Sequence, residues 1–232
     1  MNAIILAAGK GTRMKHLTND TPKSMLKIKN KPILEHILEN LPIAISKVII
    51  IIGYLGYKIK QYFGNNFNGR EIIYVECDID KLRGTGTMIY LVKNYISSKV
   101  LILMGDDLYH KKDLKNMIKQ ENWAVLAKEV SNPEDFGVLK FDNNGNIIDI
   151  IERPKEYISS FANTGAYLID DRFFKYPLFK LDNGENGLPQ TIINASKDIP
   201  IKIIKARFWH SNNNEKDFKK AEKMLSLKRK IV

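Results

Sequence analysis

Residues 2–14, "NAIILAAGKGTRM", join an apolar run to a polar loop that contains two glycines. The run over 2–8 is continuous and contains β-branched residues, which is typical of a strand buried on both faces of a largely parallel sheet. In such sheets the loop after the first strand is a favoured place for phosphate. Gly9 and Gly11 would let backbone N–H groups face anionic oxygens, and Arg13 would add charged donors. The stretch predicts an α/β fold with an anion-binding loop.

The spacing of this loop excludes two common phosphate-binding motifs. A Walker loop needs four residues between its first glycine and Gly-Lys-Ser/Thr, and here the third glycine of the dinucleotide pattern is replaced by Met14. A plain turn explains the two glycines equally well, so the loop alone does not identify a function.

Alternation of strands and helices continues outward from the loop. The apolar residues between 33 and 41 recur at helical spacing after Pro32, and 46–53 is a second buried strand. The same patterns predict helices over 57–64 and 86–96, with strands over 71–77 and 99–107. Such alternation through about residue 120 implies a doubly wound open sheet.

The second half of the chain has a different pattern. Residues 137–151, "GVLKFDNNGNIIDII", predict a hairpin around an Asn-Asn-Gly turn, and 163–169 and 199–206 predict further strands. An amphipathic helix begins at Glu215. We expect one three-layer αβα domain over 1–232, built on a Rossmann-like, mostly parallel mixed sheet.

Composition and charge limit the classes of function. The chain has 232 residues, of which 44% are hydrophobic and 27% charged, as in ordinary soluble domains. The longest apolar run, from Lys47, is too short to cross a bilayer and no signal peptide is apparent, so we expect a cytoplasmic protein. The single cysteine, Cys77, excludes an internal disulfide and does not suggest a zinc site.

A net charge of +11 attracts nucleic acids, anionic membranes and polyphosphate substrates alike. The basic residues are spread along the chain, whereas a nucleic-acid site would cluster them with surface aromatic residues. We therefore expect no nucleic-acid partner and no membrane partner. Homo-oligomerisation stays open.

Several motifs together resemble one enzyme family. Leu-Ala-Ala-Gly-x-Gly-Thr-Arg at 6–13, followed by Pro22 and Lys23, resembles the signature of the sugar-1-phosphate nucleotidylyltransferases, also called NDP-sugar pyrophosphorylases. The resemblance extends through "GTGTMI" from Gly84, "LMGDD" from Leu103, "DFGVLKFD", "IIERPKE" and "NTGAYLI". It implies a Rossmann-like sheet with helices on both faces, in agreement with the hydrophobic patterns.

The resemblance also implies a reaction and its residues. An acceptor phosphate oxygen attacks the α-phosphorus of an NTP and pyrophosphate leaves, so charge must be neutralised and the partners aligned. Arg13 and Lys23 take the catalytic roles, and the cofactor is Mg²⁺, held by Asp106 with Asp107 as the neighbour most easily confused with it. The residues implied for nucleotide binding are Leu6, Ala7, Ala8, Gly9, Gly11, Thr12, Gly84 and Thr85. Those implied for acceptor binding are Gly137, Glu152, Arg153, Lys155 and Asn163.

Two departures from the family pattern leave alternatives open. Arg153 stands where many members have a lysine that touches the sugar phosphate, so either Arg153 or Lys155 makes that contact. Near the C-terminus, "WHSNNNEKDF" replaces the usual segment with the second metal ligand. Counting back from Phe218 selects Asn213, with Ser211 and Asn212 as alternatives.

The resemblance leaves both substrates undetermined. The glutamine that often precedes the Gly-Thr segment is not apparent in "ECDIDKLRGTGT", so the base is open. A cytidylyltransferase acting on inositol phosphate or phosphocholine is the alternative within the class, and a catalytically inactive regulatory relative is another. Since the chain ends soon after its last helix, we expect the nucleotidyl-transfer domain only, with residues 1–120 binding the nucleotide and 121–232 the acceptor.

Overall fold

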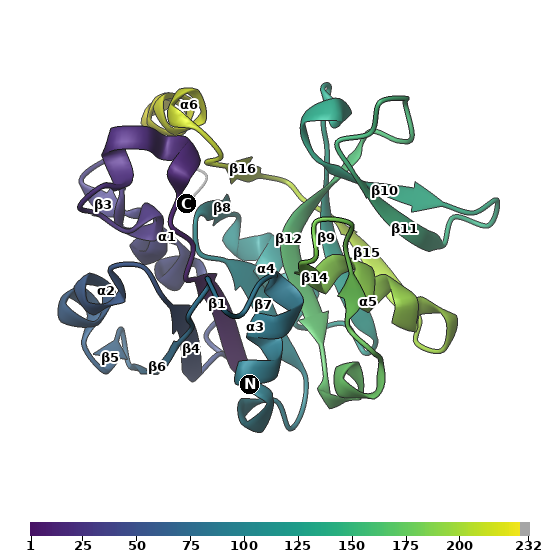
Figure 1. Ribbon diagram of the computed structural model, residues 1–232, viewed down its shortest axis with the longest axis horizontal. Coiled ribbons are helices and arrows are strands. Elements are labelled where there is room, and N and C mark those ends of the chain that lie inside the picture. The colour runs from purple at the N-terminus through teal and green to yellow at the C-terminus, as the bar shows by residue number, and fades with distance from the viewer. Residues whose placement is uncertain (228–232) are drawn as a thin grey trace.

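A ten-stranded mixed sheet runs through the computed structural model, which describes residues 1–227 (Figure 1). Its centre is β1 (Asn2–Ala7), which pairs in parallel with β4 (Lys47–Ile52) on one side and β7 (Val100–Met104) on the other. β6 (Arg70–Glu76) continues the parallel part beside β4. β1, β4 and β7 coincide with the continuous apolar runs because their side chains are buried on both faces of the sheet.

The second half of the chain extends the sheet with largely antiparallel pairs. β12 (Phe161–Ile169) pairs antiparallel with β7, with β9 (Trp123–Glu129) and with β10 (Gly137–Phe141). The predicted hairpin is confirmed, since β10 pairs antiparallel with β11 (Ile147–Glu152). β15 (Ile201–Lys205) pairs in parallel with β9.

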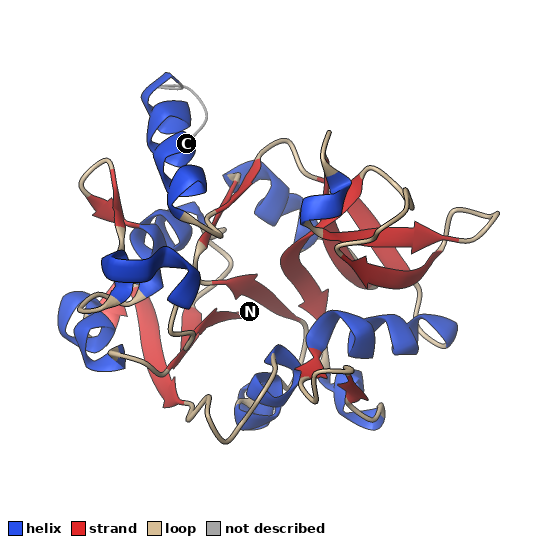
Figure 2. Cartoon of the chain, turned by 45° about the horizontal axis from the view of Figure 1, so that its top comes forward, coloured by secondary structure: helices blue, strands red, loops and turns tan. Residues whose placement is uncertain are grey.

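Helices cover both faces of this sheet (Figure 2). Alternate side chains of β1 enter different cores, with Ile5 in one and Ile4 in the other. The helices that contribute to the core of Ile5 are α1 (Ile33–Asn40), α2 (Gly56–Phe63), α4 (Lys111–Met117) and α6 (Glu215–Leu227). Those that contribute to the core of Ile4 are α3 (Thr85–Leu91) and α5 (Leu188–Asn194). The three-layer prediction is confirmed, and none of the helices within 1–227 is long and apolar enough to cross a bilayer.

Some predicted elements have different bounds in the structure. The expected helix over 86–96 is α3, which ends at Leu91 before a separate 3₁₀ turn over Lys93–Tyr95. The expected strand over 99–107 divides at Gly105 into β7 and β8 (Asp107–Tyr109). The remaining strands are short: β2 (Lys27–Ile28), β3 (Lys31–Pro32), β5 (Asn66–Phe67), β13 (Phe179–Lys180), β14 (Asn186–Gly187) and β16 (Trp209–Ser211).

Candidate active site

A first cavity of about 690 Å³ opens where β1 and β7 end. Its wall contains Ala8, Gly9 and Arg13 from the loop after β1, and Gly105 and Asp106 from the turn after β7. Parallel strands deliver their carboxyl ends to one edge of the sheet, so segments about a hundred residues apart in sequence meet there.

Lys23 and Asp106 form an ion pair in this wall. Lys23 begins the 3₁₀ turn Lys23–Met25 directly after Pro22, and its side-chain ammonium contacts the Asp106 carboxylate. The side chains are only 14% and 29% exposed. A charge pair that is partly withdrawn from water interacts more strongly than a pair at the open surface. The cavity therefore presents a fixed positive and a fixed negative group side by side.

Gly11 and Thr12 do not line the cavity. Gly11 has a φ of 66°, and a Cβ there would lie 3.0 Å from the Cβ of Lys23. The glycine thus allows its loop to pack closely against the base of the lysine side chain. Thr12 is exposed and starts the 3₁₀ segment beyond it.

The segment at Gly84 and Thr85 forms another part of the first cavity and is fixed by a distant loop. Gly84 has a φ of 93°, and a Cβ there would lie 2.3 Å from the backbone nitrogen of Asn186. The Thr85 hydroxyl accepts a hydrogen bond of 3.2 Å from the Leu188 N–H. The loop 181–190, which contains β14 and leads into the first residues of α5, was not predicted as a cavity wall because its Asn, Gly and Pro residues indicate only a turn.

A second cavity, of about 540 Å³, gathers the predicted acceptor residues Gly137, Glu152, Arg153 and Asn163. Gly137 pairs with Glu152 across β10 and β11, and a Cβ at Gly137 would lie 2.6 Å from a Glu152 carboxylate oxygen. The glycine makes room for that carboxylate. Lys155 is exposed and lines neither cavity.

The two cavities adjoin each other. Arg13, Thr85 and Glu152 line both of them. Partial removal from water raises the pKa of the Glu152 carboxyl, and the positive charge of Arg153 opposes that rise. Because the cavities share these three side chains, ligands bound in the two cavities would contact a common wall.

The C-terminal candidates lie beside Asp106 and Asp107. β16 pairs antiparallel with β8, and the Trp209 indole N–H donates a 2.9 Å hydrogen bond to the Asp107 carboxylate. Burial and the charge of Asp106 raise the pKa of Asp107 to about 7, against the opposing effect of Lys23.

The three candidate ligands near the C-terminus have different surroundings. Ser211 pairs with Asp107 across β16 and β8, and the buried Asn212 amide donates a 2.8 Å hydrogen bond to the backbone oxygen of Asp106. Asn213 lines the second cavity. Because their surroundings differ, substitutions at Ser211, Asn212 and Asn213 would each remove a different contact.

A comparison with protein-family models identifies the family of this chain. The family model described as nucleotidyl transferase matches residues 2–197. The chain belongs to the nucleotidyl transferase family.

Relatives of this nucleotidyl transferase chain are found among archaea. It is 35% identical over 228 residues to the bifunctional protein GlmU of Methanocaldococcus jannaschii, a match over 97% of this chain and 54% of that protein. It is 34% identical over 215 residues to a bifunctional sugar-1-phosphate nucleotidylyltransferase/acetyltransferase of Sulfurisphaera tokodaii, covering 90% and 51%. The chain thus spans about half the length of these two relatives.

Two further matches cover most of both proteins. The UTP--glucose-1-phosphate uridylyltransferase AglF of Haloferax volcanii is 31% identical over 182 residues, which is 75% of this chain and 74% of AglF. A crystal structure described as a glucose-1-phosphate thymidylyltransferase of Bacillus anthracis, in complex with a sucrose, superposes with a TM-score of 0.87. Its identity is 26%, over 100% of this chain and 96% of that one. The predicted fold class is confirmed.

Two residues that line the first cavity of this nucleotidyl transferase chain each carry a buried polar atom without a hydrogen-bond partner. These atoms are the Ser24 hydroxyl oxygen and the Gln190 amide oxygen, whose residues are 3% and 8% exposed. Buried polar atoms normally have partners, so both suit a polar ligand in the cavity. Neither residue was predicted, because a single serine or glutamine belongs to no motif of defined spacing.

We expect Gly84→Ala to lower both the stability of this nucleotidyl transferase chain and its binding of NTP. An added Cβ at 2.3 Å from Asn186 cannot be accommodated without moving the loop 181–190, and alanine disfavours a φ of 93°. The strain should lower the free energy of unfolding by about 1–3 kcal/mol. Thermal unfolding together with NTP titration measures both effects. Gly145→Ala is the matched control, since its φ is 81° but no atom lies within 4 Å of the added Cβ. A variant Gly84→Ala no less stable than Gly145→Ala would contradict the close packing.

Proposed function

We propose that this chain transfers a nucleotidyl group from an NTP to a sugar 1-phosphate, releasing pyrophosphate and forming an NDP-sugar. The observation that carries the proposal is the pair of adjoining cavities with Arg13 on their shared wall and Lys23 in the first. One cavity suits the NTP and the other the acceptor. The names of the Sulfurisphaera tokodaii relative and of AglF support the same transfer.

The reaction needs no covalent intermediate with the protein. A phosphate oxygen of the acceptor forms a bond to the α-phosphorus, and the bond from that phosphorus to the bridging oxygen breaks, so the electron pair leaves with pyrophosphate. Lys23 neutralises charge on the reacting phosphate and Arg13 binds the departing pyrophosphate. Both act as fixed charges aimed at the groups whose charge changes.

Two sets of residues would hold the substrates in line. Gly84 and Thr85 lie against the base and ribose of the NTP, with the backbone of residues 6–9 beside them. Glu152 and Asn163 bind the acceptor. The Asn163 amide is already oriented, since its nitrogen lies 2.7 Å from the Tyr167 hydroxyl and its oxygen accepts from the Gly165 N–H at 3.2 Å. Such preorientation lowers the entropic cost of bringing the reactants together.

The oxygen donors present fit Mg²⁺. Mg²⁺ is commonly held by one or two carboxylates together with phosphate oxygens and waters. Asp106 offers a carboxylate to the first cavity, and Asn213 lines the adjoining second cavity. We propose Asp106 and Asn213 as ligands, although within 1–227 no three His, Cys, Asp or Glu side chains form a metal-binding group. The bound ion would neutralise charge on the phosphate oxygens.

The proposal also assigns the two substrates to two parts of the chain and places the enzyme in a cellular compartment. Residues 1–120 form the nucleotide-binding half and 121–232 the acceptor-binding half, of which 228–232 lie outside the described residues. The loop 181–190 of the second half would close the nucleotide cavity of the first. We place the enzyme in the cytoplasm, acting on small molecules without a nucleic-acid or membrane partner.

Pyrophosphate release measured across a grid of substrates tests the function. Each common NTP is combined, with Mg²⁺, with hexose 1-phosphates, inositol phosphate or phosphocholine. We expect release with a hexose 1-phosphate, with UTP and dTTP as the first nucleotides to test because of the relatives' names. Release only with CTP and inositol phosphate or phosphocholine would replace the proposed acceptor. The absence of pyrophosphate release by folded protein that binds NTP would favour an inactive regulatory relative.

A further inference from the structure

One short segment links the ten-stranded sheet to the separate two-stranded sheet of β8 and β16, just before the candidate active site. Residues 206–208, here called the crossing segment, leave β15 beside β9 and lead into β16 beside β8 (Figure 1). Everything that β16 contributes to the site depends on where this segment places it.

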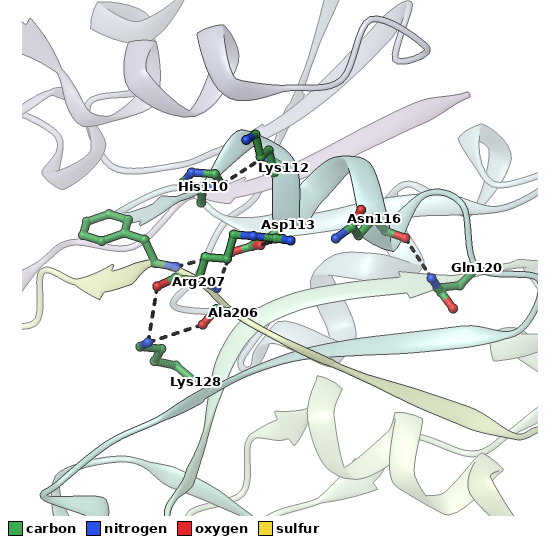
Figure 3. Close-up of polar contacts among 9 residues, drawn as sticks. His110, Lys112, Asp113, Asn116, Gln120, Lys128, Ala206 and Arg207 are labelled. Carbon is green, nitrogen blue, oxygen red and sulfur yellow. Dashed lines mark hydrogen bonds and ion pairs between the residues drawn. The ribbon is translucent and has the colours of Figure 1, made fainter. Parts of the chain in front are cut away.

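Asp113 holds the crossing segment from the side of α4 (Figure 3). Its carboxylate is 0% exposed and accepts hydrogen bonds from the backbone N–H of Arg207 at 2.7 Å and of Phe208 at 3.3 Å. The Arg207 guanidinium adds a third bond of 2.8 Å. A buried carboxylate with charge-assisted bonds to two successive N–H groups fixes backbone position and not only a side chain.

Lys128 holds the same segment from the side of β9. Its ammonium donates to the backbone oxygens of Ala206 and Arg207, both at 3.3 Å (Figure 3). The Ala206 N–H also donates to the Ala127 oxygen at 2.8 Å. The N–H groups of Arg207 and Phe208 are thus bound from α4, whereas the N–H group of Ala206 and the carbonyl groups of Ala206 and Arg207 are bound from β9.

The next residues reach the two aspartates. Trp209 follows the crossing segment directly and donates to Asp107, and Asn212 donates to the backbone of Asp106. A displacement of residues 206–208 would therefore shift both contacts, since a short strand moves with the segment that feeds it.

We propose that Asp113 is a positioning residue that sets the register of β16 against β8 and thereby the placement of Asp106 and Asp107. The proposal of a catalytic effect rests on the proposed nucleotidyl transfer. Asp113 does not touch the cavities, so it acts through the backbone of Arg207 and Phe208.

The first test compares Asp113→Asn with Asp170→Asn. Asp170 is a matched control because it is also a buried carboxylate bonded to the backbone N–H and guanidinium of one arginine, Arg172, but it does not contact the crossing segment. We expect Asp113→Asn to lower kcat on the order of 10-fold, with the KM for NTP little changed. Asp170→Asn should keep kcat even where its melting temperature falls as far. Equal kcat in the two variants at equal loss of stability would reduce Asp113 to a structural role.

A second readout does not depend on activity. With Trp123→Phe in the background, Trp209 is the remaining tryptophan of the chain, and its quenching by acrylamide reports how β16 lies in the free protein. We expect Asp113→Asn to increase quenching, and Asp170→Asn to leave it unchanged. Equal quenching in both would overturn the positioning role. Absence of turnover in every protein, with quenching changed only by Asp113→Asn, would instead contradict the proposed nucleotidyl transfer and support the positioning of β16.

Discussion

Asp106→Asn is expected to reduce turnover by about 10³-fold or more while leaving the melting temperature close to that of the unchanged chain. Asparagine has the size of aspartate, so the turn between β7 and β8 should keep its shape. The amide lacks the negative charge with which Asp106 would hold a divalent cation, and the substitution also removes the charge that Lys23 faces. The measurement is kcat for pyrophosphate release at saturating Mg²⁺, with thermal unfolding of the same preparation.

Asp107→Asn is the control for this assignment. The two carboxylates are adjacent in sequence, but Asp106 lines the first cavity, whereas Asp107 is only 6% exposed, bonds to Trp209 and lines the second cavity. We expect Asp107→Asn to cost less turnover than Asp106→Asn. If Asp106→Asn retains activity and Asp107→Asn loses it, the roles proposed for the two residues must be exchanged.

The centre of the fold was predictable because its signal is local. Four isoleucines in succession at 49–52 cannot be buried on one face only, so they require a strand with protein on both sides. The hairpin over 137–151 was predictable for a similar reason, since its turn residues stand between two apolar runs. In both cases neighbouring residues determine the structure.

β9 and α5 were not predicted, because their local preferences do not indicate the structure they adopt. β9 contains Ala, Leu, Lys and Glu, which favour helices, yet its pairing with β12 and β15 makes it a central strand. α5 contains Thr-Ile-Ile, which favours a strand, but Pro189 near its start and packing against the sheet make it a helix. Tertiary contacts decide both elements.

The candidate site was only partly accessible to sequence reasoning. Arg13, Lys23, Asp106 and Glu152 were identified through motifs, and the structure brings all four to the first cavity. The contact from Trp209 to Asp107 joins residues 102 positions apart, and no spacing rule connects them. Residues that shape a site from a distant segment are visible only once the sheet order is known.

Lys23→Ala is expected to reduce kcat by on the order of 10²- to 10³-fold, the loss associated with removing a preorganised charged contact to a reacting group. The Lys23 side chain is only 14% exposed and is held against Asp106, so its charge is fixed in the cavity before any substrate binds. A mobile surface lysine would have to be ordered during the reaction and would contribute less. The measurement is kcat for pyrophosphate release with saturating NTP and acceptor.

Lys10→Ala is the matched control for Lys23→Ala. Lys10 belongs to the same N-terminal region and also pairs with an aspartate, Asp80, but the side chains are 44% and 75% exposed and Lys10 does not line the cavity. Exposed ion pairs contribute little, so this variant should keep turnover within about twofold. A Lys23→Ala variant that loses no more activity than Lys10→Ala would exclude Lys23 from the reaction.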